Sequence, residues 1–247
     1  MKKWFLLSLC SILIVIVFIC SRAATNGVYK SPITIETTHG PSGKCDYKII
    51  YKNSARIDFR ISRPEINDNH NLLCIPAAYT RLDNDSVDGL CICNGHTHHR
   101  HAVNHSLSGV IELVNGECTI FRSYRGSTLT DSLITSIEKQ HGSLFQQTWL
   151  LVNDSCAHYK DSSLFVRRAI VKFNNGKTAI AESSAAITLW TFANDLKALG
   201  GKDALYTDMG AWDEGWYKNP GDGKVISLGN NHSQTKRQSN WVVFELN

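Results

Sequence analysis

Two Asn-Gly dipeptides constrain the fold of this chain more than any other local feature. Asn94-Gly95 separates the run 89–93 from the segment that follows it, and Asn115-Gly116 separates residues 110–113 from residues 117–121. Asn and Gly both tolerate the positive φ angles that a two-residue hairpin turn requires. The runs on either side of each turn are therefore expected to pair as antiparallel strands.

The rest of the chain extends this pattern and adds two helices. Further strands are expected at residues 33–37, 47–51, 56–61, 72–79, 144–152, 164–173, 177–182, 204–207 and 240–244. One helix should begin after Thr130 and stop at Gly142, and another should begin after Thr188 and stop at Gly200, because Thr caps helix N-termini and Gly ends helices. The sequence thus predicts an α+β fold with an antiparallel-rich mixed β-sheet and two main helices.

Residues 1–23 have the pattern of a secretory signal peptide. A basic start precedes the apolar run 4–19, and the small residues Ser21 and Ala23 then offer a cleavage site. An uncleaved N-terminal anchor is the alternative, because the apolar run is close to the lower length limit for spanning a bilayer. Lipidation of Cys20 also stays open. We expect a secreted or periplasmic, cell-envelope protein whose residues 24–247 form one domain, with membrane contact only through the N-terminal segment.

Charge and cysteine content restrict the partners. The formal net charge is +4, and removal of Lys2, Lys3 and Arg22 with the leader leaves about +1, too little for a polyanion-binding surface. No nucleic-acid partner is therefore expected. Six cysteines follow the leader, an even number that permits three disulfides in an exported chain, although buried free thiols fit equally well. They are Cys45, Cys74, Cys91, Cys93, Cys118 and Cys156.

Residues 206–217 combine three carboxylates with four aromatic rings. Aromatic rings cover the apolar faces of sugars, and carboxylates stabilise the oxocarbenium-like state of glycosidic cleavage. Asp208 is the first candidate because a short strand delivers it beside a loop. Asp213 and Glu214 are auxiliary candidates, as catalytic groups or as surface carboxylates. Trp212, Trp216 and Tyr217 are either a stacking platform for a sugar or a cover over the end of the sheet.

Arg167 is the candidate for binding a phosphate. Alternation along the predicted strand 164–173 places it on the same face as Phe165, Ala169 and Val171, the face expected to turn inward. A charge buried there needs an anionic partner, which is either a bound phosphate or an internal carboxylate. Arg237, in the polar loop 234–239, could add a phosphate contact or be solvated.

The order of elements in the C-terminal part resembles a known family. A strand with an arginine, an Asn-Gly turn, a strand, a helix ending in Gly-Gly, and then Ala-Leu-Tyr-Thr-Asp-Met-Gly at 204–210 are similar to the phosphodiester glycosidase domain family. The resemblance is clearest over residues 146–244. The family's arginine falls on Arg167 and its aspartate on Asp208, followed by Gly210. Met209 replaces a glycine of many members, and residues 76–80 lack the polar residue and both glycines of an early Asn-Gly-Gly motif.

This resemblance implies hydrolysis of the bond between a sugar and a phosphodiester oxygen in a glycan or glycoconjugate, by an exported bacterial branch of the family. It implies that Arg167 binds the phosphate, that Asp208 lies near the anomeric carbon, and that Glu214 or Asp213 activates water. The implied substrate-binding residues are Gly210, Trp212, Asp213, Trp216, Tyr217 and Arg237. A carbohydrate or phosphorylated glycan is the expected partner, and neither a metal nor another cofactor is expected.

Two other functions remain open. A non-catalytic, glycan-binding envelope protein of the same fold would use the aromatic cluster and would explain the missing Asn-Gly-Gly motif. A structural or metal-buffering surface protein would use the histidine-rich segment 96–105, in which His98, His99 and His101 are the candidate ligands. A polar hairpin arm is the simpler account of that segment, because it contains no acidic or cysteine ligand.

Overall fold

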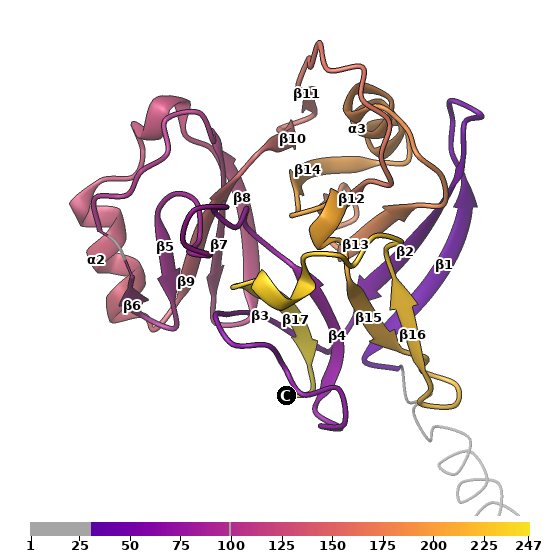
Figure 1. The fold of residues 1–247 in the computed structure, drawn as a ribbon, viewed down its shortest axis with the longest axis horizontal. Helices are drawn as coiled ribbons and strands as arrows, with labels where there is room; N and C mark the ends of the chain where they lie inside the picture. Colours follow the sequence, from indigo (N-terminus) through magenta and orange to yellow (C-terminus); the bar gives the residue numbers. More distant parts are fainter. Residues whose placement is uncertain (1–30, 99) are drawn as a thin grey trace, which may run out of the picture. The chain divides into compact units, whose positions relative to one another are not determined.

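The computed structural model describes residues 31–98 and 100–247, which contain three antiparallel β-sheets and two α-helices (Figure 1). The predicted leader, residues 1–23, lies outside the described residues. Within the described part of the chain, no helix is both long enough and apolar enough to cross a membrane. The α+β class with dominant antiparallel pairing and two helices is confirmed, although the strands form three sheets.

The first sheet has seven strands in the order β1-β2-β13-β12-β14-β10-β11. Their bounds are β1 Ile33–His39, β2 Asp46–Lys52, β13 Thr178–Ser183, β12 Arg168–Phe173, β14 Gly201–Tyr206, β10 Trp149–Val152 and β11 Ser155–Cys156. Helix α3, Leu189–Ala198, packs on one face of this sheet. The predicted N-cap is confirmed, because the Thr188 hydroxyl accepts a hydrogen bond from the backbone N–H of Thr191 at 3.1 Å.

Two five-stranded sheets complete the fold. One has the order β16-β15-β4-β17-β3, with β16 Val225–Leu228, β15 Gly215–Lys218, β4 Asn71–Pro76, β17 Trp241–Glu245 and β3 Arg56–Arg60. The other has the order β6-β5-β9-β7-β8, with β6 His96–Thr97, β5 Cys91–Cys93, β9 Ser143–Gln147, β7 Gly109–Val114 and β8 Glu117–Arg122. Helix α2, Asp131–Lys139, packs on this last sheet, and short 3₁₀ helices occur at η1 Tyr124–Gly126, η2 Gly210–Trp212 and η3 Thr235–Arg237.

Both Asn-Gly turns form the predicted hairpins. Asn94 and Gly95 have φ angles of 49° and 79°, and Asn115 and Gly116 have φ angles of 53° and 76°. The first turn joins β5 to β6 and the second joins β7 to β8, each pair antiparallel. The positive φ at both central residues is what a tight hairpin turn requires.

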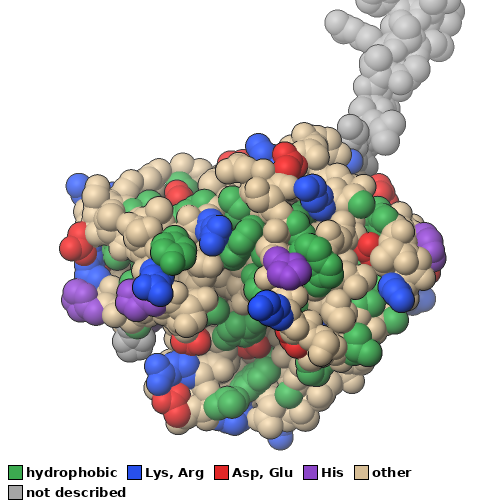
Figure 2. Space-filling view, turned by 90° about the horizontal axis from the view of Figure 1, so that it is seen from above, with side chains coloured by type: hydrophobic (Ala, Val, Ile, Leu, Met, Phe, Trp, Pro, Cys, Tyr) green, Lys and Arg blue, Asp and Glu red, His purple; other side chains and the backbone are tan. Residues whose placement is uncertain are grey.

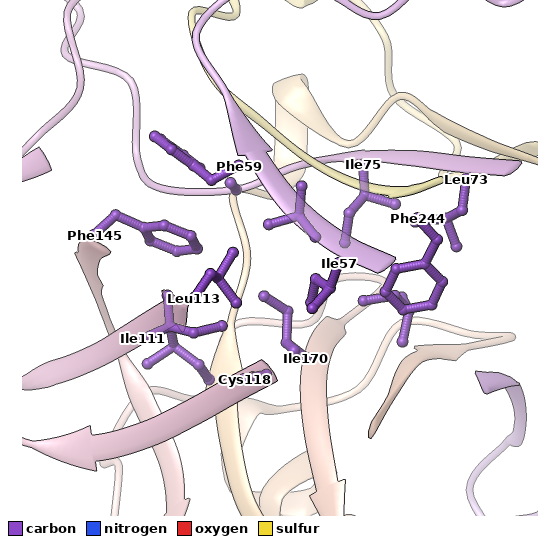
Figure 3. Packing of buried hydrophobic residues seen from close by; sticks show 14 of the residues in the cluster. Ile57, Phe59, Leu73, Ile75, Ile111, Leu113, Cys118, Phe145, Ile170 and Phe244 are labelled. Atoms are coloured by element: carbon purple, nitrogen blue, oxygen red, sulfur yellow. The ribbon is translucent and has the colours of Figure 1, made fainter. Parts of the chain in front are cut away.

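All three sheets contribute to one central core (Figure 3). Ile57 and Phe59 come from β3, Phe145 comes from β9, and Ile170 comes from β12. The rings of Phe59 and Phe145 lie 4.8 Å apart between their centroids, so two of the sheets interlock directly. All three sheets share this core, and Ser31–Asn247 form one compact unit.

Several predicted strands have different bounds in the structure, and two differ in which strands they pair with. The predicted strand 144–152 is broken at Thr148, because β9 pairs in one five-stranded sheet whereas β10 pairs in the seven-stranded sheet. The predicted strand 164–173 begins only at Arg168, and Phe165 instead forms an isolated bridge with Ile187. The six described cysteines are free, and all but Cys156 are buried, which matches the thiol alternative.

Candidate active site

Asp208 lies where two sheets meet. Strand β14 ends at Tyr206, and Thr207 still donates its backbone N–H to the carbonyl of Arg168 at 3.3 Å. One residue later the chain changes partner, and the backbone N–H of Asp208 donates to the carbonyl of Ala77, just beyond β4, at 2.9 Å. The end of β14 and the end of β4 therefore fix the backbone of Asp208 from two sides, which restricts the position of its carboxylate.

The Asp208 carboxylate is buried without a cation. Its side chain is 3% exposed, and Oδ2 accepts the backbone N–H of Thr80 at 3.0 Å. Burial raises the pKa of Asp208 to about 7, and hydrogen bonds from Thr80 and Met209 offset only part of that rise. No salt bridge joins Asp208 to a basic group among the described residues. Asp208 can therefore take up or release a proton near neutral pH, as an acid–base catalyst must.

Met209 does not disturb this turn. Its φ of −136° lies in the extended region, so the backbone requires no glycine at this position. Its side chain is buried in the cluster beneath α3. Gly210 has the positive φ instead, at 77°. The glycine that this turn requires is therefore present one residue later than Met209.

Arg167 is buried and hydrogen-bonded to its own chain. Its Nε donates to the carbonyl of Ile187 at 3.0 Å, its Nη1 donates to the Tyr206 hydroxyl at 3.0 Å, and its Nη2 donates to the carbonyl and hydroxyl of Ser163 at 2.8 and 3.2 Å. These contacts use four of the five N–H donors of a guanidinium. The nearest carboxylate is that of Asp161, 3.9 Å away and half exposed. Arg167 therefore ties the segments around Ser163 and Ile187 to the end of β14.

Arg167 and Asp208 act electrostatically on the same two tyrosines, the buried Tyr206 and the partly buried Tyr79. Burial raises the pKa of both Tyr206 and Tyr79; the positive charge of Arg167 lowers each value and the negative charge of Asp208 raises it. Both residues are thus close to the same two phenols, although no ion pair joins them within residues 31–98 and 100–247. The structure brings the predicted arginine and aspartate into one region.

Asp213 and Glu214 have other partners. Asp213 is 1% exposed, and its carboxylate accepts the backbone N–H groups of Asn230 and Asn231 at 3.0 and 2.8 Å. Glu214 forms an ion pair of 2.5 Å with Arg63. Burial acts to raise the pKa of Glu214, but hydrogen bonds and the charge of Arg63 hold it below its usual value. Neither carboxylate is positioned with Asp208, and each stabilises a contact between distant segments.

The predicted aromatic platform is largely packed inside. Trp216 and Tyr217 are adjacent on β15 and point to opposite faces, where Trp216 packs with Trp241 and Tyr217 enters the central core. Trp212 is 8% exposed, and the Arg237 guanidinium lies 5.7 Å from its ring centroid. Arg237 itself binds Asp85 and the carbonyl of Leu82. Of the two roles expected for these rings, sugar stacking or packing, Trp216 and Tyr217 have the packing role.

A small recess opens beside Gly210. Its volume is 140 Å³, and it is lined by Leu164, Phe165, Val166, Ala186, Gly210, Asp213, Asn230 and Asn231. Neither Arg167 nor Asp208 lines the recess, but Val166 precedes Arg167 and Gly210 follows Asp208 by two positions in the chain. Of the predicted substrate-binding residues, Gly210 and Asp213 line it.

A wider recess of 880 Å³ lies on the other side of the loop that follows Thr80. Its two arginines are already paired, Arg81 with Asp83 and Arg100 with Glu138 and Asp131. Neither Asp208 nor Arg167 lines it. We therefore place the candidate active site at Asp208 rather than in the larger hollow.

Two residues near the site, Arg168 and Asn240, have contacts that the sequence did not predict. Arg168 is fully buried, with its Nε 2.7 Å from Glu182 and its Nη2 donating to Glu182 and to the carbonyl of Asp213 at 2.9 Å. Asn240 binds both backbone groups of Ala78, as acceptor at 2.7 Å and as donor at 3.1 Å. This contact holds the segment from which Thr80 donates to Asp208. The hairpin register places Arg168 opposite Glu182. This register is the one sequence signal that could have predicted their ion pair.

The histidine-rich segment is only partly described, because residue 99 lies outside the described residues. The rings of His96 and His98 meet edge to face, 4.9 Å apart. In the part of the chain that the structure describes, no three His, Cys, Asp or Glu side chains are grouped to hold a metal ion. The three-histidine site cannot be compared with the structure, since one of its ligands is His99.

Known structures show the same fold at low sequence identity. The catalytic domain of zebrafish N-acetylglucosamine-1-phosphodiester alpha-N-acetylglucosaminidase, auto-inhibited by its pro-peptide, matches 87% of this chain and 82% of its own length, with a TM-score of 0.55 and 14% identity. A hypothetical protein from Synechocystis matches 88% of this chain and 63% of its own length, with a TM-score of 0.62 and 12% identity. No protein-family model and no curated protein matches the sequence. The chain thus has a fold similar to that of a phosphodiester glycosidase catalytic domain.

Proposed function

We propose that this chain is a hydrolase that cleaves the bond between a sugar anomeric carbon and a phosphodiester oxygen, with Asp208 as its essential carboxylate. The observation that carries the proposal is the buried, cation-free carboxyl of Asp208, whose pKa is about 7, at a strand end in a fold similar to that of a phosphodiester glycosidase. A carboxyl group with its pKa near the working pH is suited to proton transfer.

A single carboxylate suffices for this reaction. A water molecule attacks the anomeric carbon, Asp208 accepts the proton of that water, and the bond from carbon to phosphate oxygen breaks with its electron pair leaving on the phosphate. The products are the free sugar and a phosphomonoester, which leaves without prior protonation because its oxygen is a weak base. Asp208 thereby takes the role of base that the sequence assigned to Glu214 or Asp213, whose carboxylates are held elsewhere.

Arg167 would support this chemistry through its buried positive charge. Its guanidinium already donates hydrogen bonds to Ser163, Ile187 and Tyr206. It would therefore act on the phosphate through its charge and not through a bidentate pair of hydrogen bonds. A fixed positive charge in a region shielded from water stabilises the negative charge that develops on the departing phosphate.

Location and partner follow from the sequence. We propose that residues 1–23 are a leader, that the chain belongs to an exported bacterial branch of the phosphodiester glycosidase family, and that its partner is a phosphorylated glycan in the cell envelope or outside it. N-terminal sequencing of the protein from the culture medium and from the envelope fraction tests this. A mature chain that begins at Ala24 is expected, and retention of Met1 in a cytosolic fraction would contradict export.

The activity is tested with a panel of sugar-1-phosphodiesters. Wild-type protein should release free sugar, and Asp208→Asn should lose about 10³-fold in kcat/KM, as expected for removal of a general base. In wild type, kcat/KM should rise with pH and level off above about pH 7, because the ionised carboxylate is the active form. Asp222→Asn, at an exposed turn, is the matched control. Equal turnover by wild type and Asp208→Asn would refute the assignment.

The second candidate is a glycan-binding protein of the same fold without catalysis. It is favoured by the low exposure of Asp208, 3%, and by the internal hydrogen bonds of Arg167. Saturable binding of the same panel without any turnover by wild type would support it. In that case the difference between wild type and Asp208→Asn would appear in affinity and not in rate.

A further inference from the structure

We infer that the recess beside Gly210 is the subsite for one neutral saccharide ring, with Phe165 as its stacking face and the side chains of Asn230 and Asn231 as its hydrogen-bonding edge. The inference rests on the proposed function and deepens it, because it states which part of the substrate the recess accepts. It also replaces Trp216 and Tyr217, which are buried, as the source of the aromatic contact.

Phe165 is exposed and yet fixed. It is 47% exposed, while its backbone N–H and carbonyl both pair with Ile187, at 3.3 and 2.9 Å. The guanidinium of Arg167 lies over the ring, 5.2 Å from its centroid. A large apolar side chain held at the surface in this way loses little conformational freedom on binding a ligand. Since the ring also lines the recess, it offers a preorganised face for the apolar side of a sugar.

Two amide side chains in the lining belong to a loop that Asp213 holds. Asn230 and Asn231 are both exposed, and the Asp213 carboxylate accepts their backbone N–H groups. The Asn231 side-chain oxygen also accepts the backbone N–H of Ser233 at 3.3 Å, which leaves its NH₂ group as a donor. The loop approaches Asp213 closely, because a Cβ on Gly229 would lie 2.1 Å from the Asp213 carbonyl oxygen. Side-chain amides both donate and accept hydrogen bonds, as sugar hydroxyls do. The buried Asp213 therefore serves the recess indirectly, by fixing the residues that line it.

Size and charge indicate which part of the substrate fits. At 140 Å³ the recess is smaller than the roughly 300 Å³ at which ligand pockets usually begin, so it accepts a single ring and not an oligosaccharide. Its one ionisable lining residue, Asp213, is already hydrogen-bonded, and no basic side chain lines it. The recess is thus matched to a neutral sugar, and the phosphate must lie outside it. This favours removal of a terminal sugar from a phosphodiester.

On the face seen from above, hydrophobic side chains reach the surface among Lys, Arg and His (Figure 2). Leu164, at the rim of the recess, is 62% exposed. Leu164 and Phe165 thus provide adjacent exposed apolar surface at the recess, beside polar lining residues, as in small-ligand sites.

The experiment compares Phe165→Ala with Tyr124→Ala, which removes an aromatic ring that is 62% exposed but does not line the recess. Binding is measured by calorimetry and saturation-transfer NMR on the Asp208→Asn background, with methyl α-glucoside and methyl α-N-acetylglucosaminide as probes. Phe165→Ala should weaken binding about tenfold, and Tyr124→Ala should leave it unchanged. In the active protein, Phe165→Ala should raise KM with little effect on kcat. Asn230→Ala combined with Asn231→Ala, at exposed positions, tests the two amides without disturbing the core.

The outcomes separate the subsite from the chemistry. Binding of the probes that depends on Phe165, without turnover of any phosphodiester, would overturn the proposed function and leave the subsite standing. Unchanged affinity in folded Phe165→Ala, or no binding of any probe by the Asp208→Asn protein, would overturn the subsite. Displacement of the bound methyl glycoside by inorganic phosphate would also overturn it, because the recess would then be an anion site.

Discussion

Asp208 and Asp213 are both buried aspartates, five positions apart, yet the two regions that hold them differ in kind. At the end of β14, Asp208 has backbone hydrogen-bond donors and no cation, and burial raises its pKa to about 7. At the start of β15, Asp213 is 1% exposed and its carboxylate joins two successive backbone N–H groups of another loop. One carboxylate has a pKa near neutrality, and the other joins the start of β15 to a distant loop.

The difference teaches that burial by itself does not identify a functional carboxylate. What matters is whether the donors around the group satisfy its charge, because a buried ion without sufficient donors shifts its protonation instead. Ionised Asp208 therefore destabilises the folded state at neutral pH, whereas we expect the hydrogen bonds of Asp213 to stabilise it. Neutralising each residue tests this comparison directly, because the free energy of unfolding should rise for Asp208→Asn and fall for Asp213→Asn.

The largest effect is expected for Asp208→Asn. The folded pKa of about 7 lies above the ordinary 3.8, so the folded state binds the proton more tightly than the unfolded state. The free energy of unfolding contributed by this group is highest below about pH 4 and falls as the pH rises to 7. Asn carries no charge, so the variant does not lose this free energy as the pH rises. Its free energy of unfolding should exceed that of wild type by up to roughly 4 kcal/mol at pH 8. Urea unfolding at pH 4 and pH 8 measures it.

At pH 4 the two proteins should unfold at nearly the same urea concentration, since wild-type Asp208 is then protonated in the folded state. The exposed Asp222→Asn control should show no such change with pH. A destabilised Asp208→Asn at pH 8 would mean that the carboxylate is satisfied in the folded protein, and the contrast with Asp213 would disappear.

A smaller effect of opposite sign is expected for Asp213→Asn. The amide keeps one acceptor oxygen but loses the charge that strengthens its two hydrogen bonds to the loop. The free energy of unfolding should fall by about 2 kcal/mol at pH 8, and hydrogen exchange of the Asn230 and Asn231 amides should accelerate. An Asp213→Asn variant as stable as wild type, with unchanged exchange at these two amides, would contradict a structural role.

Local signals account for the parts of the fold that the sequence predicted well. The Asn94-Gly95 turn and the Thr188 cap act through neighbouring residues only, so a sequence pattern contains the whole cause. The break at Thr148 has a different origin, because it follows from which distant strands flank β9 and β10. The sequence pattern of residues 144–152 does not indicate that the chain passes from one sheet to another at Thr148.

The same distinction holds for the candidate site. Asp208 could be singled out because a strand end and a following glycine are local features. The roles of Asp213 and Glu214 depend on residues up to 151 positions away, such as Arg63, and β15 presents Trp216 to one buried layer and Tyr217 to another. The sequence pattern gave these residues the right chemical types for sugar binding but could not show that packing already used them.

The smallest effect is expected for Glu214→Gln, and it sharpens the comparison because the sequence placed Glu214 beside Asp208 in the chemistry. Its partner Arg63 is 46% exposed, so solvent screens the pair and its loss should cost less than about 1 kcal/mol at pH 7. The pKa of Glu214 lies below its usual value. The ion pair therefore contributes to the free energy of unfolding at pH values above the usual pKa of a glutamate, and this contribution is lost as the pH falls. Unfolding at low and high salt should show a difference only at low salt, and kcat/KM should stay within about twofold of wild type. A loss of 10²-fold or more with stability intact would instead make Glu214 the base for water and reduce Asp208 to a supporting charge.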